Sequence, residues 1–173
     1  MKNIESFFES ANEAESGVFA ALASSETRDV SGTFLSDGVF RDVIFEKKHM
    51  QGLNAEAIKF EKCKFIDCDL DSAEMLRCML NYCQWSGSNL LKSSISKSKI
   101  SNSKFIGCNL ARLQFRRVEF DAVDFSETDL TGAIFSDCDV TRCTFDRVVM
   151  NNTYFIDCHL SDEQKSMAGI VVK

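Results

Sequence analysis

The sequence predicts an all-β solenoid, a chain wound into short stacked coils around one apolar core. Every fifth residue from Leu35 to Leu160 is apolar, and the phase of this series never slips. A second series, two residues before the first, is made mostly of small residues and holds all eight cysteines. A period of five fits neither a helix, which repeats every 3.6 residues, nor a plain strand, which repeats every two. We therefore expect a repeat architecture.

The first series, which we call the bulky track, accounts for the unusual aromatic composition. Eleven of the fifteen Phe lie on it, whereas the chain has only two Tyr and one Trp. Ala55 is its only small member. Large apolar residues at a fixed period indicate one continuous core along the length of the repeats.

The second series, the small track, explains how two residues per repeat can share that core. Residues two apart in an extended segment point to the same face. Closing the period at five then requires a bend in every repeat. Successive coils must stack, because their backbone N–H and C=O groups need partners.

These residues resemble the pentapeptide repeat family, whose pattern is A(D/N)LxX with Leu or Phe at the centre. Examples are Cys68-Asp69-Leu70, Cys108-Asn109-Leu110, Thr128-Asp129-Leu130 and Ala133-Ile134-Phe135. The resemblance covers about residues 33–160. It implies a right-handed, four-sided (quadrilateral) β-helix with four repeats per coil. About six coils at the ~4.8 Å spacing of neighbouring strands give a rod roughly 30 Å long.

The ends of a solenoid need covers, and the sequence divides the chain into three parts. Residues 1–30 are expected to form an N-terminal capping helix, because Ile4, Phe7, Phe8 and Phe19 lie close to one helical face. A helix that binds a partner or serves secretion is the alternative. Residues 31–160 form the repeat domain, and residues 161–173 form a C-terminal helix and strand.

The C-terminal part begins with Ser161-Asp162-Glu163-Gln164, which has the pattern of a capping box that opens a short helix. The helix and the Gly-Ile-Val-Val strand that follows resemble the tail of the topoisomerase-protecting members of the family, the Qnr type and the microcin-immunity type. That resemblance implies a homodimer formed through this end; a simple cap is the alternative. The implied dimerisation residues are Met167, Ile170, Val171 and Val172.

One stretch, residues 46–55, breaks the pattern, because Lys48 falls on the small track and would point inward. An unpaired buried ammonium is costly. Either this coil is distorted, or about ten residues loop outward, as functional loops do in Qnr-type proteins. The candidate loop residues are Lys47, Lys48, His49 and Gln51.

The sequence offers no catalytic, cofactor-binding or metal site. The cysteines show no Cys-x-x-Cys spacing, and His49 and His159 lie far apart beside outward-facing positions. We expect the thiols to fill the interior, with Cys63 above Cys83 and Cys138 above Cys158 one coil apart. The acidic N-terminus and the lack of a long apolar run predict a cytoplasmic protein without a membrane segment.

Charge is the one functional signal, because it is banded along the chain. Residues 1–74 carry 15 acidic and 8 basic residues, residues 75–118 carry no acidic and 8 basic ones, and residues 119–163 carry 11 acidic and 2 basic ones. The net charge of −6 disfavours direct nucleic-acid binding. The last band is the candidate acidic partner surface: Glu119, Asp121, Asp124, Glu127, Asp129, Asp137, Asp139, Asp146 and Asp157.

Three functions fit these observations. The resemblance implies a protein that mimics DNA and inhibits or protects DNA gyrase or topoisomerase IV, conferring resistance to quinolones or to a gyrase toxin. A general protein-interaction module, such as a regulator or a secreted effector, fits the fold equally well, because a fold alone does not assign a function. An enzyme is the third hypothesis, and no residue pattern favours it.

Overall fold

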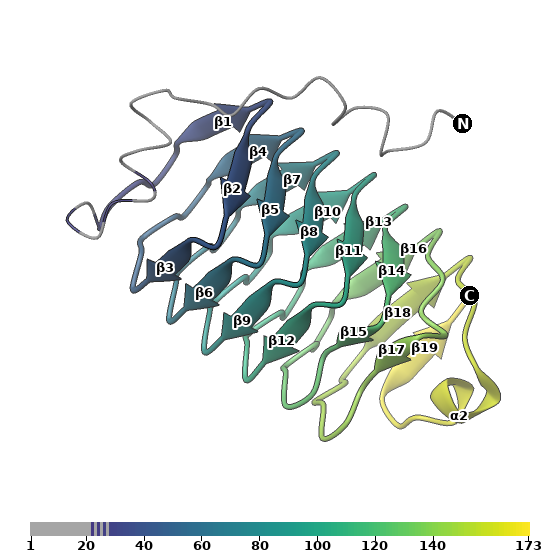
Figure 1. Cartoon of the computed structure of the whole chain (residues 1–173). Helices are drawn as coiled ribbons and strands as arrows, with labels where there is room; N and C mark the ends of the chain where they lie inside the picture. The colour runs from purple at the N-terminus through teal and green to yellow at the C-terminus, as the bar shows by residue number, and fades with distance from the viewer. Residues whose placement is uncertain (1–21, 23, 25, 27) are drawn as a thin grey trace.

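A computed structural model shows the repeats as a four-sided parallel β-solenoid (Figure 1). It describes residues 22, 24, 26 and 28–173. The predicted N-terminal capping helix falls almost wholly outside these residues. Strands at equivalent positions of successive coils pair in parallel with an offset of 20 residues, as in Phe34↔Asn54, which confirms four repeats per coil.

Three of the four sides are sheets. Wall 1 contains β1 (Phe34–Ser36), β4 (Asn54–Glu56), β7 (Glu74–Leu76), β10 (Ser94–Ser96), β13 (Gln114–Arg116), β16 (Ile134–Ser136) and β18 (Thr153–Ile156). Wall 2 contains β2 (Val39–Arg41), β5 (Lys59–Glu61), β8 (Met79–Asn81), β11 (Lys99–Ser101) and β14 (Glu119–Asp121). Wall 3 contains β3 (Ile44–Glu46), β6 (Lys64–Ile66), β9 (Gln84–Ser86), β12 (Lys104–Ile106), β15 (Val123–Asp124) and β17 (Cys143–Thr144).

Wall 4 is held by single bridges and not by strands. The bridges join residues 29, 49, 69, 89, 109, 129 and 149 in succession. Seven coils thus pass along wall 1, one more than the sequence predicts.

The bend that closes each repeat lies two residues after the bulky track. From residue 32 to residue 157 every fifth residue has a positive φ, with Arg142 the single exception. Most of these corner residues are not glycine; Asp37, Arg77 and Ala122, for example, have φ of 52°, 54° and 51°. The left-handed conformation costs an ordinary residue about 1–2 kcal/mol. The hydrogen bonds between coils hold it, as from Arg77 N to Ser96 O at 3.0 Å.

The core consists of stacked rings, best seen behind wall 3. The ring centroids of Phe65 and Trp85 lie 3.7 Å apart, and those of Trp85 and Phe105 lie 5.4 Å apart. The column continues through Phe125 and Phe145 at 5.3 and 5.4 Å. Such ring stacks add to the stabilisation that comes from burying the rings. The bulky track is therefore the core, as predicted.

The small track is buried beside these rings, and its polar members are hydrogen-bonded. Ser88 Oγ donates to Phe65 O at 3.1 Å and accepts from Cys68 N at 3.1 Å. A cysteine occupies the same geometry, since Cys63 Sγ donates to Phe40 O at 3.4 Å. Serine and cysteine can both occupy this track because each is small and can donate to the same kind of carbonyl.

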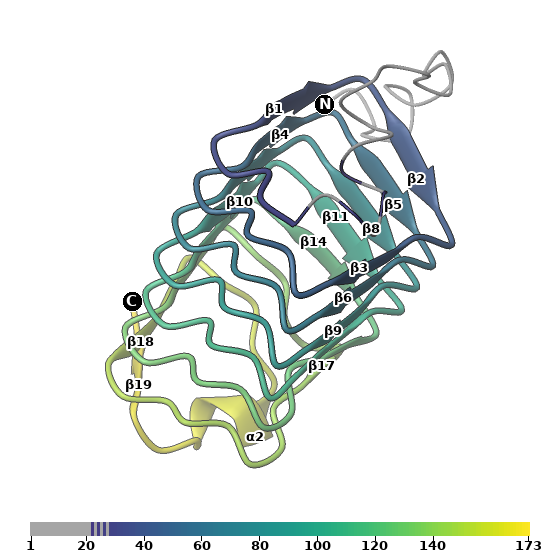
Figure 2. The same cartoon turned by 90° about the vertical axis from the view of Figure 1, so that its left-hand side faces the viewer.

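The C-terminal end contains a short helix and a strand (Figures 1 and 2). The helix α2 (Asp162–Lys165) opens with the capping box: Ser161 Oγ accepts from Gln164 N at 3.2 Å, and Ser161 N donates to Gln164 Oε1 at 2.9 Å. Buried Gln164 also donates to Val140 O and Cys143 O, carbonyls of the last complete coil. The strand β19 (Ile170–Val172) then pairs with β18 and ends wall 1.

Residues 46–55 neither loop out nor distort the coil. His49 bridges Asp29 and Asp69, and Met50 N donates to Asp69 O at 2.7 Å, as in other coils. Lys48 does point inward and is 3% exposed, but its Nζ donates to Ser24 O. Burial lowers the pKa of Lys48. The residue is tolerated because the chain before the first coil supplies a carbonyl.

Candidate protein-binding surface

The structure spreads the nine predicted acidic residues over several sides of the rod. Glu119, Asp121 and Asp139 lie on wall 2 or its continuation, where Asp139 bridges Glu119 and His159. Asp137 and Asp157 stack at the corner between walls 1 and 2, where Asp137 N donates to Ile156 O. The remaining four lie elsewhere: Asp124 and Asp146 on wall 3, Glu127 at the corner that follows it, and Asp129 on wall 4. We call the first five the acidic surface.

Basic residues offset part of this charge. Arg142 pairs with Asp121 at 2.5 Å, and Arg117 lies 3.7 Å from Asp137. Arg147 contacts both Glu127 and Asp146, at 2.5 and 3.4 Å. All these pairs are well exposed, so each adds little to stability. These pairs do weaken the negative electrostatic potential of the acidic residues, which is smaller than the number of carboxylates alone suggests.

Three of the acids also hold the backbone. Asp124 Oδ1 accepts from Ser126 N at 3.0 Å, Asp129 Oδ1 from Thr131 N at 2.8 Å, and Asp139 Oδ1 from Thr141 N at 3.0 Å. These are Asx turns, in which the side chain replaces a backbone acceptor. The Thr141 hydroxyl and N–H lower the pKa of Asp139. Reversing the charge at these positions would disturb folding, contrary to what the tracks alone suggest.

The same turns explain the Asp or Asn of the repeat pattern. On wall 4, Asn109 Oδ1 accepts from Ala111 N at 3.1 Å, and its Nδ2 donates to Asn89 Oδ1 at 2.9 Å. Asn89 in turn donates to Asp69 Oδ1 at 2.9 Å. The ladder shows that an amide replaces a carboxylate here without loss of the turn.

The predicted dimerisation residues lie at the C-terminal end of wall 1. Met167 and Ile170 are half-buried and pack against the core, whereas Val172 is 51% exposed. In the part of the chain that the structure describes, β19 is the C-terminal edge strand of its sheet, and β1 is the other edge. The backbone N–H groups of Val171 and Lys173 point toward β18, and Lys173 N donates to Phe155 O at 2.9 Å. The alternation of a parallel ladder therefore turns the N–H groups of Ile170 and Val172 outward.

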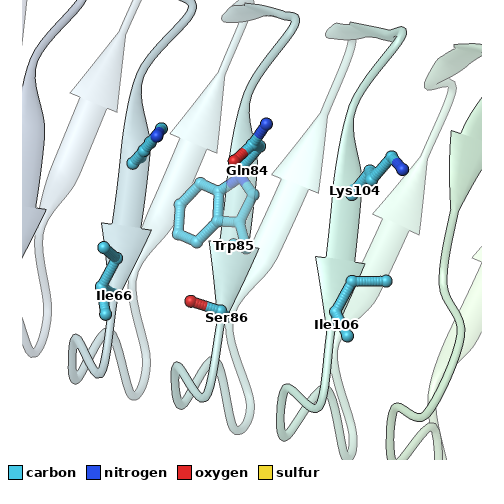
Figure 3. Close-up of a pocket in the computed structure, with 7 residues that line it drawn as sticks. Ile66, Gln84, Trp85, Ser86, Lys104 and Ile106 are labelled. Carbon is cyan, nitrogen blue, oxygen red and sulfur yellow. The ribbon is translucent and has the colours of Figure 1, made fainter.

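Wall 3 carries a shallow hollow of about 220 Å³ (Figure 3). Its rims are two rows of outward side chains, one polar and one mostly apolar, and Trp85 lies between them. The rows are Lys64, Gln84 and Lys104, and Ile66, Ser86 and Ile106. Nothing in the hollow pairs a nucleophile with a base. Among residues 28–173, no group of three His, Cys, Asp or Glu is placed to hold a metal ion.

The cysteines stack as predicted, and none of the eight forms a disulfide. Burial raises the pKa of Cys78 to about 12. Cys158 differs, because it is only half-buried and its thiol interacts with that of Cys138 one coil earlier. The hydrogen bond from Cys138 lowers the pKa of Cys158 and leaves that of Cys138 raised. Its position on the interior track makes Cys158 a core residue near an end.

Two models of pentapeptide repeat families together match most of the coils. The family described as "Pentapeptide repeat region" matches residues 39–115, and "Pentapeptide repeats (8 copies)" matches residues 98–137 and 124–162. This chain belongs to the pentapeptide repeat family. A search of curated proteins finds no match.

Solved structures similar to this pentapeptide repeat protein include QnrB1, described as a plasmid-mediated fluoroquinolone resistance protein. QnrB1 is 13% identical with a TM-score of 0.49, and the match covers 82% of this chain and 93% of QnrB1. Rfr23 from the cyanobacterium Cyanothece 51142 is 12% identical with a TM-score of 0.38, covering 78% and 92%. HetL from Nostoc sp. strain PCC 7120, involved in heterocyst differentiation regulation, is 13% identical with a TM-score of 0.28, covering 83% and 80%.

A helix that crosses a membrane needs a certain length and hydropathy. In the part of the chain that the structure describes, no helix is both long and apolar enough to span a bilayer.

Proposed function

We propose that this pentapeptide repeat protein is a non-catalytic binder of a protein partner, and that the partner meets the acidic surface at the C-terminal end. The observation that carries the proposal is the position of that surface. Its five carboxylates lie on the last coils, and one of them, Asp157, adjoins the end of β19, where Asp157 N donates to Lys173 O at 3.0 Å. Exposed charge on flat walls suits recognition of a macromolecule better than of a small substrate.

The specific partner we propose is a type II topoisomerase, DNA gyrase or topoisomerase IV. The coils that carry Glu119, Asp139 and His159 span ~10 Å at strand spacing, and duplex DNA places about six phosphates over that length. The acidic surface has five carboxylates there, two of them offset by Arg117 and Arg142. It would therefore imitate a short DNA segment, while the rod as a whole would not.

A homodimer through β19 would extend this surface. An exposed edge strand can accept a strand from another chain by main-chain hydrogen bonds. A twofold axis would bring β19 against its own copy and place the two acidic surfaces on either side of the joint. Sedimentation of wild type and Val172→Lys tests this, because a charge on the exposed edge should leave only the monomer. A wild-type monomer at high concentration would refute the dimer.

A gyrase supercoiling assay, with and without a quinolone, tests the target. We expect the wild type to inhibit supercoiling or to restore it in the presence of the drug at micromolar concentration. No effect in either arm would remove topoisomerase as the partner and leave the protein-binding role to be tested with other proteins.

Neutral variants test the acidic surface without damage to the turns. Glu119→Gln, Asp139→Asn and Asp157→Asn together remove three charges, and the Asn at 139 keeps the acceptor for Thr141 N. The matched control is Asp37→Asn, Asp42→Asn and Asp67→Asn, three exposed corners near the other end with φ of 51–55°. The first set should abolish the effect and the control should keep it. Equal activity of both sets would exclude the acidic surface as the contact.

A general interaction module, for instance a regulator or a secreted effector, is the second candidate. The ion pairs that offset four of the nine acids favour it, because they weaken the resemblance to DNA. A purified partner that binds the wild type while gyrase activity is unchanged would favour this candidate. A cytoplasmic location remains part of the proposal and can be tested by fractionation of cells.

A further inference from the structure

The acid-free middle of the chain produces one concentrated basic surface, on wall 1. Lys92 and Arg112 occupy equivalent corners of successive coils between walls 4 and 1, and Lys97 and Arg117 do so between walls 1 and 2. Arg116 ends β13 between these corners. All five side chains are exposed. We call them the basic patch; the strands beside it, β10 and β13, are labelled in Figure 1.

Most of the cations of this patch have no counter-charge. Arg117 lies 3.7 Å from Asp137. For Lys92, Lys97, Arg112 and Arg116 no ion pair or side-chain hydrogen bond occurs within the described part of the chain. Elsewhere arginines are paired across coils, for example Arg41 with Glu61 at 3.2 Å. Four neighbouring unpaired cations on a protein of net charge −6 create a local positive potential.

The shape of the wall limits what can bind there. Between the corners the outward side chains of β10 and β13 are Ser94, Ser96 and Gln114, which are small or polar. No aromatic side chain stands among them on which a nucleic-acid base could stack. A flat, polar, hydrogen-bonding surface favours carboxylates, since guanidinium groups bind them in a bidentate manner.

The patch is short along the rod axis, and this length favours a short acidic peptide over a long polyanion as the ligand. The patch spans two coils, ~5 Å apart. Along the rod axis, Glu74 of β7 lies on one side of it, and Asp137 and Asp157 lie on the other. Duplex DNA, with one charge per ~1.7 Å, would lay phosphates against these acids. A few adjacent carboxylates would contact the cations alone.

We propose that the basic patch is a second docking surface, which binds a short cluster of aspartate and glutamate side chains on a partner protein. It lies mainly on wall 1 and adjoins the acidic surface at the corner between walls 1 and 2, where Arg117 lies 3.7 Å from Asp137. The proposal does not depend on the topoisomerase hypothesis, because it needs only an acidic segment.

Fluorescence anisotropy with a labelled hexaglutamate peptide at low salt tests the proposal directly. The patch variant is Lys92→Glu, Lys97→Glu, Arg112→Glu and Arg116→Glu. The control is Lys47→Glu, Lys62→Glu, Lys64→Glu and Lys104→Glu, which makes the same change in net charge on other sides of the rod. Glutamate is compatible with a corner, as Glu127 has a φ of 62°. Circular dichroism checks that both variants fold.

We expect the peptide to bind the wild type and the control with affinities within about threefold of each other, and the patch variant at least about tenfold more weakly, since charge reversal replaces attraction by repulsion. If the patch variant does not fold, the corresponding Gln substitutions give the same comparison. Absent wild-type binding, or an equal loss in the control, would overturn the proposal. So would tighter binding of a 12-base-pair DNA duplex that the patch substitutions abolish, because it would assign the patch to nucleic acid.

Discussion

Phe125, on the bulky track behind wall 3, contacts aromatic rings above, below and beside it. Its centroid lies 5.3 Å from that of Phe105, 5.4 Å from that of Phe145 and 5.8 Å from that of Phe115. We expect Phe125→Ala to lower the free energy of unfolding by ~3–5 kcal/mol, because it leaves a cavity among stacked rings. Exposed Glu127→Ala, two residues away, should cost almost nothing. Similar denaturation midpoints for the two variants would contradict the assignment of the tracks.

Cys158 should be the most reactive thiol. Its lowered pKa means that the thiolate, which is the nucleophile, forms at a lower pH than in an ordinary cysteine. Cys78 and Cys83, with pKa values of about 12, should stay protonated and protected. Iodoacetamide labelling of the folded protein at rising pH, read by peptide mass spectrometry, should modify Cys158 first. Labelling of Cys78 or Cys83 at the same rate would show that the coils open, or that the burial is wrong.

At the scale of the element, two glycines differ in why a larger residue would be destabilising: at one the backbone conformation alone is unfavourable, and at the other a side chain would also clash. Gly107 has a φ of 61° with open space around it, whereas a Cβ on Gly169 would lie 1.4 Å from Met150 O. Gly107→Ala should cost about 1 kcal/mol, from the left-handed conformation alone. Gly169→Ala should displace β19 and so abolish any dimer. Thermal denaturation and sedimentation of both variants measure the difference; an unaltered oligomer in Gly169→Ala would contradict the placement of β19.

The elements show what the sequence can and cannot predict. The period of five predicts which residues face inward, because a fixed spacing places the same two positions of every repeat on the inner face. It predicts that a bend exists, but not that residues such as Lys47 and Arg77 adopt positive φ, since few residues other than glycine favour that conformation. The carbonyl partner of Lys48 could not be predicted, because Ser24 lies outside the repeats.

The candidate site was less predictable than the fold. The nine acids lie in one segment of the sequence, residues 119–157, yet a coil with four sides places neighbouring repeats on different walls. Asp124 and Asp129, five residues apart, thus lie on wall 3 and wall 4. The Asp or Asn of the repeat pattern is the sequence signal for the Asx turns, because its side-chain oxygen can accept a hydrogen bond from the backbone N–H two residues later. The ion pairs formed by Arg142 and Arg147 could not be predicted, because a prediction would require both the 20-residue register and the positions of the side chains.

At the scale of the whole molecule, the rod is a stack of equivalent coils, each contacting only its neighbours. Stability should therefore depend on phase more than on length. Removal of residues 71–90 joins Leu70 to Leu91 and deletes one complete coil, so every later residue keeps its wall. Removal of residues 71–88 deletes less of the chain but moves every later bulky residue off its track.

Thermal unfolding of these two deletion variants, followed by far-ultraviolet circular dichroism, tests the five-residue coil most directly. We predict that the variant without residues 71–90 keeps a β-type spectrum and a cooperative transition, whereas the variant without residues 71–88 loses both. Equal stability of the two variants, or a mainly helical spectrum of the intact protein, would contradict the coil on which both proposed surfaces depend.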